Sequence, residues 1–262
     1  MSDKPKKGQR LTLELDGYDA DGLAVGDGPG EHRVCVSGGL AGERVQVTVE
    51  HVSPHRPVAW VRIEQVEQPA PERTRDHGKG HSCGGCGWAH LTYEAQLEIK
   101  AQRARDVLTE VGAAPAVLAD PPVVASPRPD GYRNRGKYVI RRQRGDLVLG
   151  GYVPRSHRVV STLGCPVMAP EVDRAARALA RLLGRRNVPV YDERTREGLL
   201  RYAGVRVNHR GEVLVTVVVT GAGALPWRLL GDALAEEVDG LVGLTLDLNA
   251  EPGNVLFTGR QQ

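Results

Sequence analysis

The chain of 262 residues is 40% hydrophobic and 26% charged, and its formal net charge is +3. A chain of this length can bury a hydrophobic core, and we expect two compact units. No apolar run is long enough to span a bilayer, and the N-terminus lacks the apolar stretch of a signal peptide. These features argue against a membrane or secreted protein and predict a cytoplasmic location.

The first part of the chain has the pattern of a small β unit. After a basic tail at residues 1–7, apolar and polar residues alternate in short runs between glycine-rich turns over residues 8–67. About five short strands in this length predict a closed or nearly closed β-barrel. Cys35 lies between Val34 and Val36 with no activating neighbour, so we interpret it as a small core residue. The clearest runs are Arg10 to Leu15, Arg33 to Val36, Arg44 to Val49 and Val58 to Ile63.

A linker, a cysteine loop and a helix come next. Residues 68–91 are charged and proline-bearing and contain the cysteine loop, and residues 92–112 have the pattern of a helix. Thr92 can cap this helix, Glu94 favours its positive end and Gly112 can end it. Its apolar residues recur at the spacing that places them on one face. That face consists of Leu97, Ala101, Ala104, Leu108 and Val111.

The cysteine loop predicts a metal or cluster site. Cys83 and Cys86 are separated by two glycines, which leave the backbone free to curl around an ion, and Cys165 lies far along the chain before Pro166. A disulfide or redox pair, or two incidental thiols, are the alternatives. A reducing compartment favours ligands over a disulfide.

Residues 113–262 predict a mixed α and β domain. Residues 136–143 and 147–153 form a predicted hairpin, and 158–162 is a further strand that leads to Cys165. A helix is expected from Pro170 to Gly184. Strands at 202–207, 213–220 and 241–248 and a helix at 226–237 complete the domain. The predicted fold class is therefore α+β, a β-barrel followed by a mixed domain.

Basic residues are concentrated in the predicted hairpin region. Between Arg128 and Arg158 there are nine Lys or Arg and two Asp, a local charge of +7, with Tyr132, Tyr138 and Tyr152 interleaved. Such clustering is typical of a surface that binds phosphates and stacks on bases. A solvated strand face whose arginine stems cover apolar surface is the alternative.

Several ordered motifs resemble those of one protein family. The first unit carries Asp21 to Gly26 and Ala41 to Val45, and the cysteine loop leads into Tyr93 to Lys100. The later part carries Tyr132 to Arg135 and the Cys165-Pro166 pair. Together these motifs resemble the RNA uracil-5 methyltransferases that act on transfer or ribosomal RNA, and the resemblance extends over nearly the whole chain.

The resemblance implies an RNA-binding TRAM barrel and a [4Fe-4S] cluster that ties the cysteine loop to the end of a strand. Cys83, Cys86 and Cys165 match three family ligands, while His77 occupies the place of the fourth. His77 then completes the site, or His81 completes a zinc site instead, or neither histidine is a ligand. The basic residues expected to contact phosphates are Arg133, Arg135, Lys137, Arg141, Arg142 and Arg144, and Tyr132 or Tyr138 is expected to stack on an unpaired base.

The resemblance also implies what this chain lacks. The chain ends at Gln262, where the family's methyltransferase domain would begin, so we expect no catalytic residue and no S-adenosylmethionine site. The strand at 213–220, Gly221-Ala-Gly223, the next helix and Asp247 imitate a nucleotide-binding fingerprint. Pro226 occupies its third small position, which favours an ordinary strand-turn-helix connection.

Three functions remain at this stage. The first is an RNA-binding, substrate-recognition protein that is not catalytic alone, with structured ribosomal or transfer RNA as its partner and neither DNA nor a membrane. The second is one half of a split or truncated methyltransferase that needs a separate catalytic chain. The resemblance implies that the helix at residues 92–112 packs on the catalytic domain, so under this reading we expect its apolar face to lie exposed or to contact a partner chain. The third is a zinc-stabilised nucleic-acid-binding module unrelated to methylation.

Overall fold

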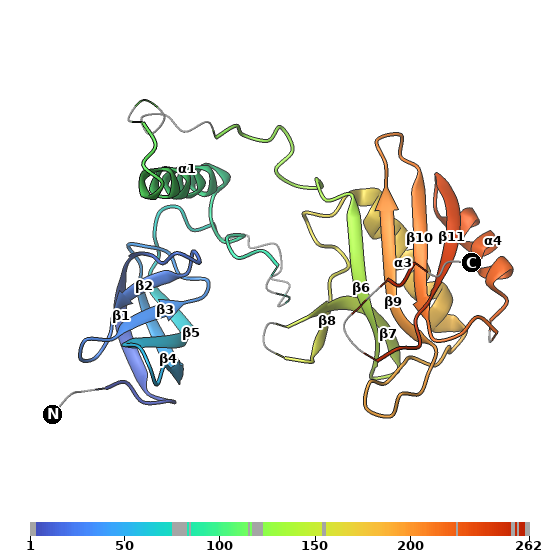
Figure 1. The fold of residues 1–262 in the computed structure, drawn as a ribbon, viewed down its shortest axis with the longest axis horizontal. Helices are drawn as coiled ribbons and strands as arrows, with labels where there is room; N and C mark the ends of the chain where they lie inside the picture. Colours follow the sequence, from blue (N-terminus) through green and yellow to red (C-terminus); the bar gives the residue numbers. More distant parts are fainter. Residues whose placement is uncertain are drawn as a thin grey trace. The chain divides into compact units, whose positions relative to one another are not determined.

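The computed structural model describes residues 4–74, 83, 85–114, 116, 123–153, 156–223, 225–252, 255 and 257–259. It divides into two compact units. One contains residues 1–77 and 86–125, and the other contains residues 78–85 and 126–262. Figure 1 shows a barrel with one helix in the first unit and an open sheet with helices in the second. Within the described part, no helix has both the length and the apolar composition that crossing a membrane requires.

The first unit is built on a closed five-stranded barrel, as expected from the sequence. Its order is β1-β2-β3-β5-β4, with β3 and β5 parallel and β4 returning to pair with β1. A Cβ at Gly26 would lie 2.3 Å from the Glu14 carbonyl oxygen, so only glycine allows this close approach of β2 to β1. The strands are β1 (Arg10–Tyr18), β2 (Ala24–Asp27), β3 (Arg33–Val36), β4 (Arg44–Val52) and β5 (Val58–Gln68).

Alternate residues of these strands fill the barrel with Val, Leu and Ala side chains. Cys35 is buried as well, which confirms that it is a buried residue, although it does not belong to the cluster that fills the barrel. Burial raises the pKa of the Cys35 thiol to about 11, and Asp19 adds to the shift. The thiol is therefore protonated and unreactive at neutral pH.

A buried ion pair ties the barrel to the segment that follows it. Glu43 is 0% exposed, accepts hydrogen bonds from the amides of Leu40 and Ala70, and forms an ion pair with Arg73. Burial acts to raise the pKa of Glu43, but the Arg73 guanidinium and the two amides lower it overall.

Helix α1 (Tyr93–Glu110) packs against segments that flank the barrel strands within the first unit. The Thr92 hydroxyl accepts from the Ala95 amide at 3.3 Å, which confirms the predicted cap. The inward contact is made by Ala95 and Ile99 against Leu40, not by the apolar face predicted from the sequence. Of that predicted face, Leu97, Ala101, Ala104 and Leu108 are half-buried and Val111 is 73% exposed.

The second unit is a six-stranded sheet with the order β11-β10-β9-β6-β7-β8. Only β10 and β11 pair in parallel, because helix α4 connects them. The strands are β6 (Arg135–Gln143), β7 (Asp146–Tyr152), β8 (Val159–Ser161), β9 (Leu200–Val207), β10 (Val213–Val219) and β11 (Leu241–Leu248).

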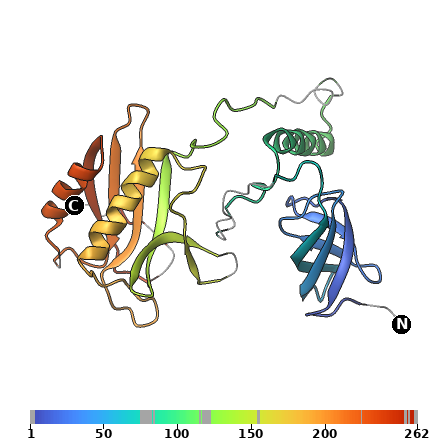
Figure 2. The same cartoon turned by 180° about the vertical axis from the view of Figure 1, so that it is seen from behind.

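Helices α3 (Pro170–Arg185) and α4 (Trp227–Glu237) cover one face of this sheet, as the view from behind in Figure 2 shows for α3. Leu179 and Leu183 of α3 and Leu230 and Leu234 of α4 are almost completely buried against the strands. The opposite face, called the open face below, has only a small apolar cluster that includes Val139, Tyr202 and Val218. The α+β fold predicted from the sequence is therefore confirmed at the level of a barrel and a mixed sheet with helices. The TRAM assignment of the barrel gains no support beyond its architecture.

Candidate nucleic-acid interface

Strand β6 separates its residues between the two faces of the sheet. Tyr138 and Ile140 point into the core beneath the helices, and Arg135, Lys137 and Arg141 alternate with them on the open face. The strand has this amphipathic form because its even positions are apolar or glycine up to Ile140, and its odd positions carry most of the charge. The open face therefore receives a row of cations from a single strand.

Strand β9 adds a further cation beside this row. Arg206 pairs directly with Arg135 across the two antiparallel strands, and Gly204 pairs with Lys137. Arg135, Lys137 and Arg206, called the open-face cations below, are all exposed, and no carboxylate in the described part of the chain forms an ion pair with them. Like charges placed directly opposite each other destabilise a sheet. Such a cluster is suited to binding an anion.

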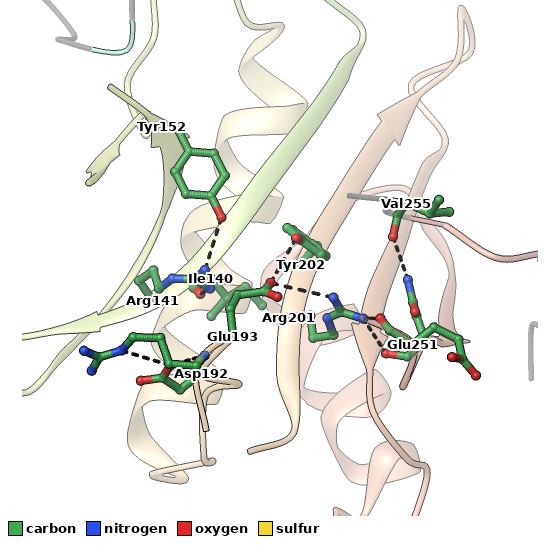
Figure 3. A network of polar contacts seen from close by, with 11 residues as sticks. Ile140, Arg141, Tyr152, Asp192, Glu193, Arg201, Tyr202, Glu251 and Val255 are labelled. Carbon is green, nitrogen blue, oxygen red and sulfur yellow. Dashed lines mark hydrogen bonds and ion pairs between the residues drawn. The ribbon is translucent and has the colours of Figure 1, made fainter. Parts of the chain in front are cut away.

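Arg141 continues the row toward β7. Its Nη2 donates to the Tyr152 hydroxyl at 3.1 Å and its Nη1 donates to the Ile140 carbonyl at 2.9 Å, as Figure 3 shows. Tyr152 is 37% exposed, so part of its ring remains accessible beside the guanidinium. Nearby, burial raises the pKa of the Tyr202 hydroxyl, and Tyr152 and Glu193 add to the shift.

The chain after β11 folds back onto the open face. We call the described residues 249–252, 255 and 257–259 the C-terminal segment. Asp247 is fully buried and accepts hydrogen bonds from the amide and hydroxyl of Thr258 and from the Gly259 amide. Phe257 packs with the apolar cluster of the open face, and its ring lies 5.8 Å from the Arg135 guanidinium carbon and 5.9 Å from the Lys137 amine.

A buried arginine holds the start of this segment. Arg201 is 1% exposed, and its Nη1 donates to the carbonyl oxygens of Asn249 and Glu251, each at 2.8 Å (Figure 3). Its guanidinium carbon lies 4.7 Å from the Tyr191 ring centroid and 5.6 Å from that of Tyr202. The two rings and the carbonyl oxygens compensate the cost of burying this charge.

Sequence reasoning missed Arg201, Arg206 and Phe257. A charged residue within the apolar run Leu199 to Ala203 was the available signal for Arg201, because such a residue in a central strand needs buried partners. Arg206 has no sequence signal without knowledge that β9 pairs with β6. Phe257, the single phenylalanine of the chain, lies outside any predicted element.

The structure divides the residues predicted to bind RNA. Arg135, Lys137 and Arg141 lie together on the open face, and Tyr132, just before β6, is 62% exposed. Tyr138, in contrast, is 1% exposed beneath the helices, so its predicted stacking on a base is wrong.

Of the remaining predicted basic residues, Arg142 does not join the row, and Arg133 and Arg144 lie outside strand β6. Arg142 points to the helix-covered face and donates to the carbonyl oxygens of Gly145 and Val188. Arg144 occupies the hairpin turn with a φ of 52°. Arg133 contributes its backbone, which pairs with Val167 and Ala169 before the strand begins. The selection of Arg142 from the charge run ignored the alternation of side chains along a strand. The side chains of Arg133 and Arg144 are exposed, and their contact with phosphates stays a prediction.

The metal site predicted from the cysteines is not found. No three His, Cys, Asp or Glu side chains lie close enough to hold a metal ion in the part of the chain that the structure describes. Cys83 and Cys165 are half-buried and Cys86 is exposed, and none of the three forms a disulfide. His77 and His81 lie outside the described residues. The expectation of a [4Fe-4S] or zinc centre is therefore corrected for Cys83, Cys86 and Cys165, which form no such group among the described residues, while the role predicted for His77 is not tested.

The crossover from β10 through α4 to β11 does not fit a nucleotide site. The strands are parallel, as such a site requires, but both carboxylate oxygens of Asp247 are occupied by Thr258 and Gly259. A nucleotide-binding fingerprint needs this carboxylate for the ribose. The structure thus supports the ordinary strand-turn-helix connection.

Comparisons with known proteins identify relatives across nearly the whole chain. No protein-family model matches the sequence. An uncharacterized RNA methyltransferase of Gloeobacter violaceus is 32% identical over 257 residues, which are 96% of this chain and 55% of that protein. A second uncharacterized RNA methyltransferase, of Thermosynechococcus vestitus, is 32% identical over 98% of this chain and 56% of that protein. The chain thus spans about half the length of the curated relatives it matches.

A solved structure has the same fold. The tRNA (uracil-54, C5)-methyltransferase of Pyrococcus abyssi, in complex with S-adenosyl-L-homocysteine, superposes with a TM-score of 0.68 at 23% identity. The match covers 94% of this chain and 53% of that one.

These findings correct two expectations from the sequence. The expectation of a non-catalytic RNA binder is contradicted by relatives that match nearly all of this chain and are named RNA methyltransferases, and the expectation of a separate catalytic chain gains no support. Absence of the catalytic domain is likewise unsupported. The expectation that this chain has no S-adenosylmethionine site is contradicted by a neighbour of the same fold that holds S-adenosyl-L-homocysteine. The similarity to this solved structure extends over the fold of both units.

Proposed function

We propose that this protein is an RNA methyltransferase that transfers a methyl group from S-adenosylmethionine to C5 of a uracil in transfer or ribosomal RNA. The names of its relatives and the fold it shares with a tRNA (uracil-54, C5)-methyltransferase support this reaction class. Bound S-adenosylmethionine would supply the electrophilic methyl group. We assign no described residue to the donor, because the one nucleotide-like crossover does not fit it.

We further propose that the open face of the sheet binds the RNA backbone. The observation that carries this proposal is the set of open-face cations, which are exposed, adjacent and without a carboxylate partner among the described residues. Each can neutralise a phosphate and release counterions, which makes binding salt-dependent. Arg141 and the partly exposed ring of Tyr152 extend the face toward a base.

RNA binding by this face can be tested with a charge-matched pair of variants. Replacing Arg135, Lys137 and Arg206 together with alanine should weaken binding of a labelled RNA stem-loop and reduce the slope of log K against log salt by about 2. The control variant replaces Arg174, Arg185 and Arg228, exposed arginines of the helices on the other face, and loses the same charge. Equal losses in the two variants would show that only net charge matters.

The reaction is tested separately in the cell. Deleting the gene should remove 5-methyluridine from one position of transfer or ribosomal RNA, as measured by mass spectrometry of RNA digests, and returning the gene should restore it. An unchanged 5-methyluridine content would rule out the proposed reaction while leaving the RNA-binding test unaffected.

A further inference from the structure

We infer that Phe257 is a positioning residue for RNA binding, which holds the side chains of Arg135 and Lys137 in the orientation that meets a phosphate. The inference rests on the proposed function, since it takes the open face as the RNA-binding surface. It adds a role for the C-terminal segment, which neither the charge pattern nor the relatives assign.

The Phe257 ring fits against the sheet at Gly204 of β9, where there is no side chain. A Cβ added to Gly204 would lie 3.0 Å from Cζ of the Phe257 ring, closer than a side chain tolerates without displacing its neighbour. The absence of a side chain at Gly204 therefore lets the tip of the ring reach the β9 backbone. Because Gly204 pairs with Lys137 on β6, the ring stands directly beside the cation row.

Both neighbouring cations contact this ring. The Arg135 guanidinium carbon and the Lys137 amine lie 5.8 and 5.9 Å from its centroid, within the range of cation–π attraction. Lys and Arg lose more rotamer freedom than most residues when a ligand immobilises them. A ring that already restrains two such side chains lowers the entropy lost when RNA binds, and so increases affinity.

The C-terminal segment is anchored well enough to act in this way. Asp247 receives three donors from Thr258 and Gly259, next to Phe257, and Asn249 donates to the Val255 carbonyl at 2.7 Å. Arg201 holds the carbonyl oxygens of Asn249 and Glu251. These bonds hold the described residues on either side of Phe257 in the sequence and do not involve Arg135 or Lys137.

The chemistry also allows the opposite role, in which Phe257 occupies the cations and competes with RNA. The two roles predict opposite changes in RNA affinity when the ring is removed. Removing a positioning ring weakens RNA binding, whereas removing a competitor strengthens it. The absence of a carboxylate partner for Arg135 and Lys137 among the described residues favours positioning, since the ring contributes no negative charge that a phosphate must displace.

The test measures the affinity of the whole chain for a fluorescein-labelled RNA stem-loop at low salt. Phe257→Leu keeps an apolar side chain over Gly204 but removes the ring, and Gly204→Ala displaces the ring while retaining every cation. Each should weaken binding by about three- to tenfold. Val255→Ala is the matched control, because its side chain is 66% exposed and its link to the segment is through the backbone carbonyl.

A second background separates positioning from a general structural effect. In a variant that carries both Arg135→Ala and Lys137→Ala, Phe257→Leu should have no further effect on affinity, because the side chains it positions are gone. An equal loss in both backgrounds, an unchanged affinity or tighter binding would each overturn the inference. If the variant with Arg135→Ala and Lys137→Ala, still carrying Phe257, binds RNA as well as the original protein, the open face is not the RNA-binding surface. The experiment therefore distinguishes failure of the proposed binding face from failure of the role inferred for Phe257.

Discussion

The two faces of the central sheet are built from alternate residues of the same strands and differ in almost every physical respect. The helix-covered face is apolar, and residues such as Ile140 and Leu179 are fully buried there. The open face combines a small apolar cluster with exposed cations and the C-terminal segment. One face carries the stability of the unit, and the other accepts unfavourable charge contacts that suit a ligand. The comparison predicts that substitutions on the two faces separate stability from RNA binding.

The largest effect is expected on the helix-covered face. Leu179→Ala removes a fully buried side chain of α3 and leaves a cavity against the sheet, so it should lower the free energy of unfolding by about 2–5 kcal/mol. Urea denaturation followed by circular dichroism measures this loss. Leu229→Ala on α4, whose side chain is 59% exposed, is the control and should change stability by less than about 0.5 kcal/mol. A similar loss in both variants would show that burial does not distinguish these positions.

Most of the element pattern was predictable because it depends on local periodicity. Helix α3, with Pro170 in its first turn, and the hairpin of β6 and β7 follow from apolar spacing and turn residues. The alternation of apolar and basic residues along β6 also predicts which side chains share a face of the sheet. It places Tyr138 and Arg142 on the face opposite Arg135, Lys137 and Arg141 and so excludes them from the predicted RNA-binding surface.

The rest of the site depends on tertiary contacts that no local pattern encodes. Arg206 joins the cations only because β9 pairs with β6, and Phe257 arrives from a segment without regular structure that Arg201 and Asp247 anchor. The predicted metal site failed for the same reason. A Cys-x2-Cys pair gives local spacing, but whether distant ligands converge is decided by the fold.

A smaller effect is expected at the buried tyrosine that sequence reasoning placed on the wrong face. The Tyr138 hydroxyl has no hydrogen-bond partner among the described residues, and burial raises its pKa, with Asp173 and Cys165 adding to the shift. Tyr138→Phe removes an unsatisfied group, so it should raise the free energy of unfolding by up to about 1 kcal/mol and leave RNA affinity unchanged. Tyr202→Phe is the matched control, since its hydroxyl lies 3.5 Å from Glu193 and should not give this gain. Weaker RNA binding by Tyr138→Phe would show that the Tyr138 hydroxyl contributes to the RNA-binding surface.

The smallest effect tests whether the open face sacrifices stability for binding. Arg206→Ala removes the like charge opposite Arg135, so it should raise the free energy of unfolding by about 0.3 kcal/mol at low salt, while RNA affinity falls. The gain should disappear at 1 M salt, where the Debye length is only about 3 Å. Arg206→Lys retains the charge and should show no gain, which separates electrostatics from packing. A gain that persists in high salt, or a variant that loses both stability and RNA affinity, would mean that Arg206 is a structural residue. Opposite signs for stability and binding would instead show that these arginines are kept adjacent for an anion that lies between them.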